Sequence, residues 1–369
     1  MFGMGRLRSM RAPHLLTLAL LVGTAACEPA TGPQTTAELD TKAALADYQA
    51  LEKVFSSDGW AGLQSLGGRT PTSTNAAVAA VRSLPTVAAG GSGRRFALDL
   101  FNDMAAARGA NVPLAKTIIS DRHIGKTLVY DSALDHYVVD PTRTGAPKNG
   151  VRFIVYEVDA ASRPIGGREI GYADLLDEGA NSGEAIALRL VLVTRGTTML
   201  DYRMRVELRD TSGTIDVSGF AAEGASRLDF TIGLEGKTAG GRTLIDADFD
   251  LALKPQNFNI SGTVRGVEEG RDGEGMVNVN VRHQQNTLKV DLKGSGGLLD
   301  GSIKFNGKIF VTISGSSKDP TLRGPSGQPL TGPEVLVVLS IMDIVDSVFD
   351  LIEDLVKPVD NLVVLGWIL

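Results

Sequence analysis

The chain alternates apolar and polar side chains over many short segments from about residue 184 to residue 315. The clearest are residues 228–234 (LDFTIGL), 244–253 (LIDADFDLAL), 276–281 (MVNVNV) and 288–292 (LKVDL). A period of two residues is typical of a β-strand with one face against a core and the other face in water. Polar, glycine-rich turns separate these segments. The sequence therefore predicts a large antiparallel sheet.

The same pattern defines a β domain over residues 120–315. We expect strands near residues 127–131, 136–140, 151–158, 185–193, 198–208, 214–220, 227–235, 243–253, 257–265, 275–283, 287–293, 300–306 and 308–314, with residues 166–180 partly irregular. Asn306-Gly307 is a strong signal for a two-residue hairpin turn. Because most connections are too short for a crossover helix, neighbouring strands are expected to pair antiparallel.

The alternation also assigns side chains to the two faces of the sheet. About ten strands must twist and curl, so the apolar face needs either a cover or a ligand. The residues of this face that we expect to contact a ligand are Ile245, Phe249, Leu251, Val279 and Val290.

Residues 331–369 are predicted to supply the cover. Thr331-x-x-Glu334 is a capping-box pattern, and residues 335–356 continue as an apolar helix with a narrow polar stripe. Three aspartates near the middle of this helix would each cost about 2.5–3.5 kcal/mol at a bilayer centre, so we do not expect it to span a membrane. We expect it to pack on the sheet, with three further ligand-facing residues: Leu336, Ile344 and Phe349.

The N-terminus carries the features of an export signal. Residues 1–26 combine a basic start with a short apolar run, too short for a stable span, and Thr24-Ala25-Ala26-Cys27 follows. This ending resembles the lipobox of bacterial lipoprotein precursors, with Thr24 where leucine is commonest. The resemblance implies lipidation of Cys27, the only cysteine of the chain, and an outer-membrane address. Residues 27–35 would then be the lipid anchor and tether.

Residues 36–110 are predicted to be a helical N-terminal region. Helical spacing of apolar side chains places helices at about residues 36–57, 76–84 and 96–108. The fold class expected for the whole chain is therefore mainly β (α+β): a large curved antiparallel meander sheet or half-barrel, with N-terminal helices and a C-terminal apolar covering helix.

Motifs for chemistry are scarce. The three histidines after the signal region (His123, His136 and His283) lie on separate segments without metal-ligand spacing. Two acidic groups stand out: Asp246, Asp248 and Asp250 on one strand, and Glu268, Glu269, Asp272 and Glu274 in a glycine-rich turn. The first is best explained as a solvated face, and the second does not follow the spacing of an EF-hand. The sequence predicts no catalytic residue, metal or cofactor, and a net charge of −6 disfavours nucleic acid.

These features lead to one preferred expectation and two alternatives. The preferred one is a membrane-anchored, non-catalytic envelope lipoprotein that binds a lipid or other amphiphile in a cavity between the sheet and the C-terminal helix. Its architecture would resemble periplasmic lipid and lipoprotein carriers, which pair a half-barrel with a helical lid. The first alternative is a structural or protein-interaction lipoprotein of the outer membrane. A hydrolase is less well supported, and the sequence identifies no protein partner.

Overall fold

The computed structural model describes residues 57–66, 119, 121–179, 185–209, 211–240, 242–269, 272–316 and 319–331, and the single positions 334, 335 and 338. All of them belong to the second of two compact units, Asp40–Leu369. The predicted helices at residues 36–57, 76–84 and 96–108 lie outside the described residues, apart from residue 57.

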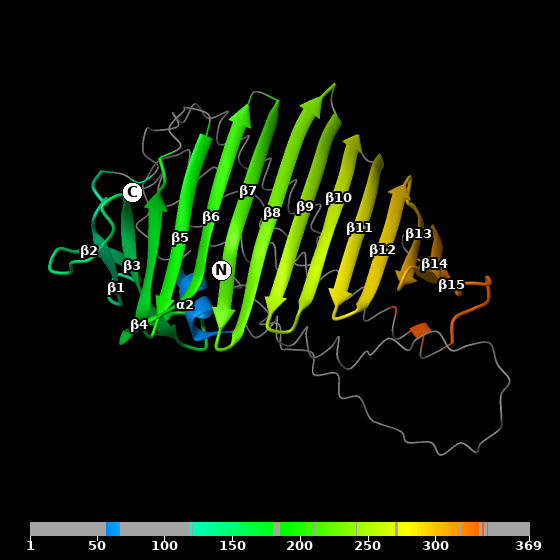
Figure 1. Ribbon diagram of the computed structural model, residues 1–369. Coiled ribbons are helices and arrows are strands. Elements are labelled where there is room, and N and C mark those ends of the chain that lie inside the picture. The colour runs from blue at the N-terminus through cyan, green and yellow to red at the C-terminus, as the bar shows by residue number, and fades with distance from the viewer. Residues whose placement is uncertain are drawn as a thin grey trace, which may run out of the picture. The chain divides into compact units, whose positions relative to one another are not determined.

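The described chain forms one open sheet of 15 strands (Figure 1). The strands are β1 (Thr127–Asp131), β2 (His136–Asp140), β3 (Gly150–Val158), β4 (Pro164–Asp177), β5 (Ala185–Thr194), β6 (Thr197–Arg209), β7 (Ser212–Glu223), β8 (Ser226–Ala239), β9 (Arg242–Lys254), β10 (Phe258–Glu269), β11 (Asp272–His283), β12 (Asn286–Ser295), β13 (Leu298–Phe305), β14 (Lys308–Ser316) and β15 (Asp319–Arg323). From β3 to β15 each strand lies beside its neighbours in sequence, so the predicted meander is confirmed.

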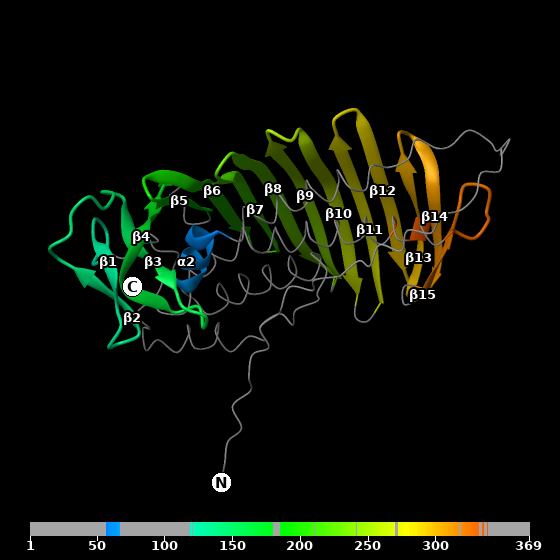
Figure 2. The same cartoon turned by 90° about the horizontal axis from the view of Figure 1, so that it is seen from below.

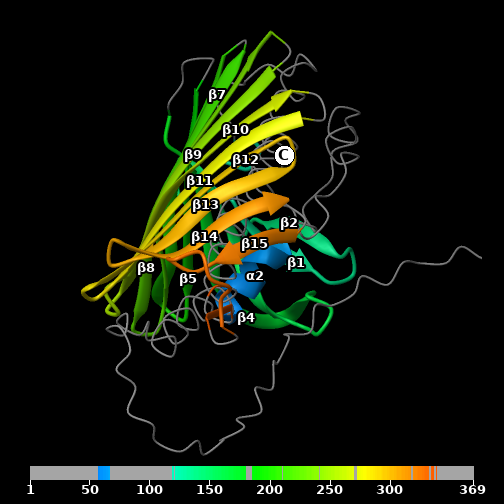
Figure 3. The ribbon, with the colours of Figure 1, turned by 90° about the vertical axis from the view of Figure 1, so that its right-hand side faces the viewer.

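Pairing is antiparallel throughout the meander, as predicted. One pair differs: β1 lies between β2 and β3 and pairs parallel with β3, at Thr127↔Arg152 and Leu128↔Phe153. Seen from the β15 end, the strands change direction steadily, so the sheet is twisted (Figure 3). The predicted hairpin turn is present, because Asn306 and Gly307 have φ angles of 48° and 78°, both positive as a type I′ turn requires.

Two strands differ from the sequence-based expectation. Residues 166–180 were predicted to be partly irregular, but Pro164–Asp177 is a strand of 14 residues. Its polar stretch Gly166–Glu169 and two register shifts against β3, between Val155 and Val158, conceal the alternation. The five-residue strand β15 was not predicted, because it is short and contains Pro320.

The described helix, α2 (Asp58–Leu66), was also missed. Ser57 caps it: the Ser57 hydroxyl oxygen accepts a hydrogen bond from the Trp60 amide at 3.3 Å. The helix lies on one face of the sheet (Figure 2). Its glycines permit close contact there, since a Cβ on Gly62 would lie 2.4 Å from the Val155 Cγ1 atom of β3. Because Ser57 caps its first turn, α2 starts at Asp58 as a helix that the sequence analysis did not predict.

Burial separates the two faces of the sheet as predicted. On β9 the residues at every second position, such as Phe249 and Leu251, are 4% and 1% exposed, while the intervening Asp248 and Asp250 are exposed. We call the buried side, on which α2 lies, the apolar face and the other side the polar face. The two edges are the short strands β2 and β15, and a short edge strand limits unwanted strand addition.

Candidate functional site

Five of the predicted ligand-facing residues lie together on the apolar face. Phe249 pairs with Gly262, Gly262 with Val279, and Val279 with Val290, so they form one row across β9–β12. The row continues as Ile303 and Val311, both fully buried. The five predicted residues are 0–5% exposed: Ile245, Phe249, Leu251, Val279 and Val290. The sheet therefore brings them to one apolar surface, closed to solvent.

Glycine and aromatic side chains complement each other on this surface. A Cβ on Gly262 would lie 2.6 Å from the Phe249 Cζ atom, so the ring occupies the space that a side chain would fill. In the next row Tyr202 and Phe230 meet edge to face, with ring centroids 5.9 Å apart. Tyr202 is 1% exposed, and burial raises its pKa well above the ordinary value. This part of the apolar face is closely packed.

The described helix α2 covers only one end of the apolar face. Its packing contacts are with β3, β4 and β5, while residues of β6–β14 such as Val217, Val290 and Val311 are also fully buried. Nine strands at a spacing of about 4.8 Å measure about 40 Å across, and a helix with its side chains is about 10 Å wide. The cover of this region therefore needs more apolar surface than α2 supplies.

Four positions at the start of the predicted C-terminal helix are described (residues 331, 334, 335 and 338), and one of the two hydrogen bonds of the predicted capping box is present. The Thr331 amide and hydroxyl both donate to the Glu334 carboxylate, at 2.7 and 2.8 Å. These hydrogen bonds, from the backbone first and then the side chain, lower the pKa of Glu334. The Val335 amide bonds back to the Thr331 carbonyl, and Val338 is 1% exposed. The other three predicted ligand-facing residues, Leu336, Ile344 and Phe349, lie outside the described residues.

The aspartates that the sequence singled out on β9 lie on the polar face of the sheet. Asp246 is neutralised by Arg265, which approaches to 2.9 Å. Asp248 lies over Gly233, and its pKa is raised by desolvation and by the nearby Asp246 and Asp216. Among the described residues no group of three or more acidic, histidine or cysteine side chains is placed to hold a metal ion.

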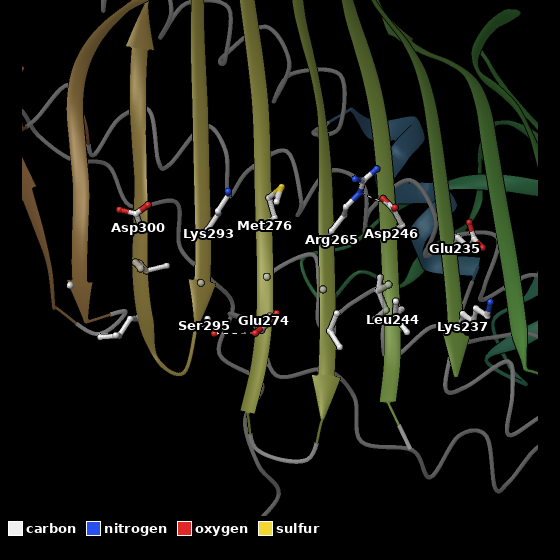
Figure 4. Close-up of a pocket in the computed structure, with 18 residues that line it drawn as sticks. Glu235, Lys237, Leu244, Asp246, Arg265, Glu274, Met276, Lys293, Ser295 and Asp300 are labelled. Carbon is white, nitrogen blue, oxygen red and sulfur yellow. Dashed lines mark hydrogen bonds and ion pairs between the residues drawn. The ribbon is translucent and has the colours of Figure 1, made fainter. Parts of the chain in front are cut away.

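The structure reveals a groove on the polar face that was not predicted (Figure 4). It has a volume of about 860 Å³ and is lined by Glu235, Lys237, Leu244, Ile245, Asp246, Arg265, Gly266, Val267, Glu274, Gly275, Met276, Lys293, Gly294, Ser295, Leu298, Leu299, Asp300 and Gly315. We call it the polar-face groove. The sequence held one signal for it: Leu244 and Leu298 occupy positions that the alternation assigns to the polar side.

The polar-face groove lies between two rows of side chains that cross the strands. One row pairs Asp246 with Glu235 and Arg265, and the other pairs Leu244 with Lys237 and Val267. The intervening position on each strand faces the apolar side, and on five strands it is a glycine: Gly236, Gly266, Gly275, Gly294 and Gly315. The floor of the groove is therefore largely main chain.

None of the helices described by the structure has the length and hydropathy of a membrane-spanning segment. Comparison of the chain with family models, with curated proteins and with solved structures gave no match.

Proposed function

We propose that this protein is a membrane-anchored envelope lipoprotein that holds a lipid or other amphiphile against the apolar face of its sheet, beneath the C-terminal segment 331–369. The observation that carries this proposal is the extent of that face, which remains apolar and buried from β5 to β14. It offers far more aliphatic surface than one helix needs for packing. The anchor is supported by the sequence alone, through Cys27 and the signal-like residues before it.

The C-terminal segment is the best candidate for the movable cover. At its exposed start Thr331 donates hydrogen bonds to Glu334, and Val338, seven residues after Thr331, is buried. Because the ligand-facing residues of the sheet are at most 5% exposed, an amphiphile can reach them only when part of the cover shifts. Because the buried face is about 40 Å wide, part of its cover can shift without exposing the whole core.

Native mass spectrometry of the full protein, purified from the membranes of its own cells, tests this proposal. We expect a mass excess from one bound amphiphile in addition to the acyl chains on Cys27. A Cys27→Ala variant separates the two contributions, because it should lose the anchor and be released from the membrane while it keeps the bound amphiphile. Protein that is consistently empty in both forms would contradict the proposal.

A further inference from the structure

We infer that the polar-face groove binds an extended segment of a partner protein that carries both aliphatic side chains and charges of both signs. The groove and the amphiphile surface lie on opposite faces of the sheet. Peptide binding in the groove and amphiphile binding on the apolar face can therefore be tested independently of each other.

Two exposed leucines lie on one wall of the groove, on β9 and β13, in a row that continues between them through Val267, Glu274 and Ser295. Leu244 and Leu298 are 42% and 63% exposed, and Val267 lies beside Leu244 in the same row. Leu244 and Leu298 are two of the five large apolar side chains that are exposed among the described residues. Exposed aliphatic side chains that line a groove mark a surface that is covered in a complex. The partner must therefore present aliphatic side chains to this wall.

The charges of the groove indicate which class of polymer the partner belongs to. The groove is lined by three cations (Lys237, Arg265 and Lys293) and four acids (Glu235, Asp246, Glu274 and Asp300). This near balance gives no attraction for a polyanion such as nucleic acid or a phosphorylated polymer. The lining residues include no aromatic ring on which a sugar could stack. A polypeptide is the polymer that combines aliphatic side chains with charges of both signs.

The row of side chains that contains Asp246 also predicts how the peptide is aligned along the groove. In this row Asp246 and Arg265 pair with each other, whereas Glu235 on β8, Lys293 on β12 and Asp300, which lies opposite Lys293 on β13, form no ion pair within the described chain. Four strand spacings of about 4.8 Å place Glu235 and Lys293 about 19 Å apart, which is about six residues of extended peptide at about 3.3 Å each. We therefore expect a basic residue opposite Glu235 and an acidic residue about six positions away, opposite Lys293.

The main chain of the groove floor cannot bind the peptide, so side chains must recognise it. The strands β8–β13 that carry the floor are paired on both sides, so their amide and carbonyl groups are engaged in the sheet. The peptide therefore cannot bind by adding a strand, and it lies across the strands instead. Its affinity depends on the aliphatic contacts and its orientation on the two charges.

Selection from a peptide library displayed on phage, against the full chain carrying Cys27→Ala, tests this inference. Selected peptides should share aliphatic residues and a base and an acid about six positions apart. Fluorescence anisotropy should show at least about a tenfold loss of affinity for Leu298→Glu. The matched control is Ile309→Glu, at a residue that is 45% exposed outside the groove and should leave the affinity unchanged. Circular dichroism of both variants checks that they are folded.

Exchange of the two charges gives a second, more specific test. The double variant Glu235→Lys, Lys293→Glu should prefer peptides in which the order of base and acid is reversed. The inference is overturned if no peptide is enriched, or if Leu298→Glu and Ile309→Glu bind the selected peptides equally. It is also overturned if Leu298→Glu abolishes self-association or binding to phosphatidylethanolamine vesicles instead, since either result would assign the groove to another partner.

Discussion

Gly262 shows at the scale of one residue how little space the apolar face leaves. A Cβ there would lie 2.6 Å from both the Phe249 ring and the carbonyl oxygen of Asn278. Since the main chain of β11 cannot move without breaking its pairing, Gly262→Ala should lower the free energy of unfolding by about 1–3 kcal/mol. Chemical denaturation measures this change.

The matched control is Gly294→Ala on β12, where the nearest atom to an added Cβ lies at an ordinary 3.5 Å. It should cost much less than Gly262→Ala. If both substitutions lowered the unfolding free energy equally, the loss would come from β-sheet glycines in general, and the close packing around Phe249 would not be its cause.

The raised pKa of Asp248 predicts how the stability of the protein depends on pH. Its pKa is raised, by desolvation first and then by Asp246 and Asp216, so the folded state disfavours the carboxylate. Stability is therefore lost as the pH rises from the ordinary carboxyl range through the raised pKa, and it stays lost at neutral pH. Asp248→Asn should stabilise the protein at pH 7 by a few tenths of a kcal/mol, because the site is exposed. Below the unfolded-state pKa the difference should vanish.

Asp229 provides a control of opposite sign. Burial acts to raise its pKa, but hydrogen bonds from Lys254 and Arg227 outweigh burial and lower it. Its carboxylate therefore contributes stability above the unfolded-state pKa, and this stability is lost as the pH falls through the lowered value. Asp229→Asn should destabilise the protein at neutral pH. Equal and same-signed effects of the two substitutions across a pH series would contradict both assignments.

At the scale of elements, the hydrogen bonds between Thr331 and Glu334 lie where the C-terminal helix is predicted to start. Thr331→Ala removes the hydroxyl that donates to Glu334 and should cost about 1 kcal/mol of local stability. Limited proteolysis should then cut the segment after residue 331 faster, while Thr331→Ser, which keeps a hydroxyl, should resemble the original protein. Unchanged cleavage of Thr331→Ala would show that this cap does not hold the segment in place.

The elements also show which parts of the fold the sequence could predict. β9, β11 and β12 were predicted because each alternates strictly, with a core on one side and water on the other. β4 was not, since its glycines and bulges hide the period, and α2 was missed although Ser57-Asp58 is an N-cap signal. Alternation also placed Phe249, Val279 and Val290 correctly on one face. It could not predict their alignment in one row, because that depends on the register between strands.

The polar-face groove illustrates a second limit of the sequence. Its walls join residues of seven strands, and no local pattern shows that these strands lie side by side in this order. Leu244 alone looks like an ordinary exposed leucine. It becomes informative only because the register of the sheet places it beside Val267 and in the same row as Leu298.

At the scale of the molecule, each face of the sheet has its own proposed binding function. Fifteen strands at about 4.8 Å measure about 70 Å across, with the short strands β2 and β15 at the edges. The apolar face would hold an amphiphile beneath the C-terminal segment, and the polar face would dock a peptide. An anchor at Cys27 would keep both surfaces near the membrane.

Photolabelling with a diazirine-bearing fatty acid tests the central claim most directly, because it reports which face the amphiphile touches. On the full protein we predict saturable labelling of peptides that contain Phe249, Val279 or Val290 and of residues 331–369, suppressed by an excess of unlabelled oleate. Labelling that does not saturate, or that falls only on polar-face residues such as Leu298, would contradict the claim that the apolar face is an amphiphile site.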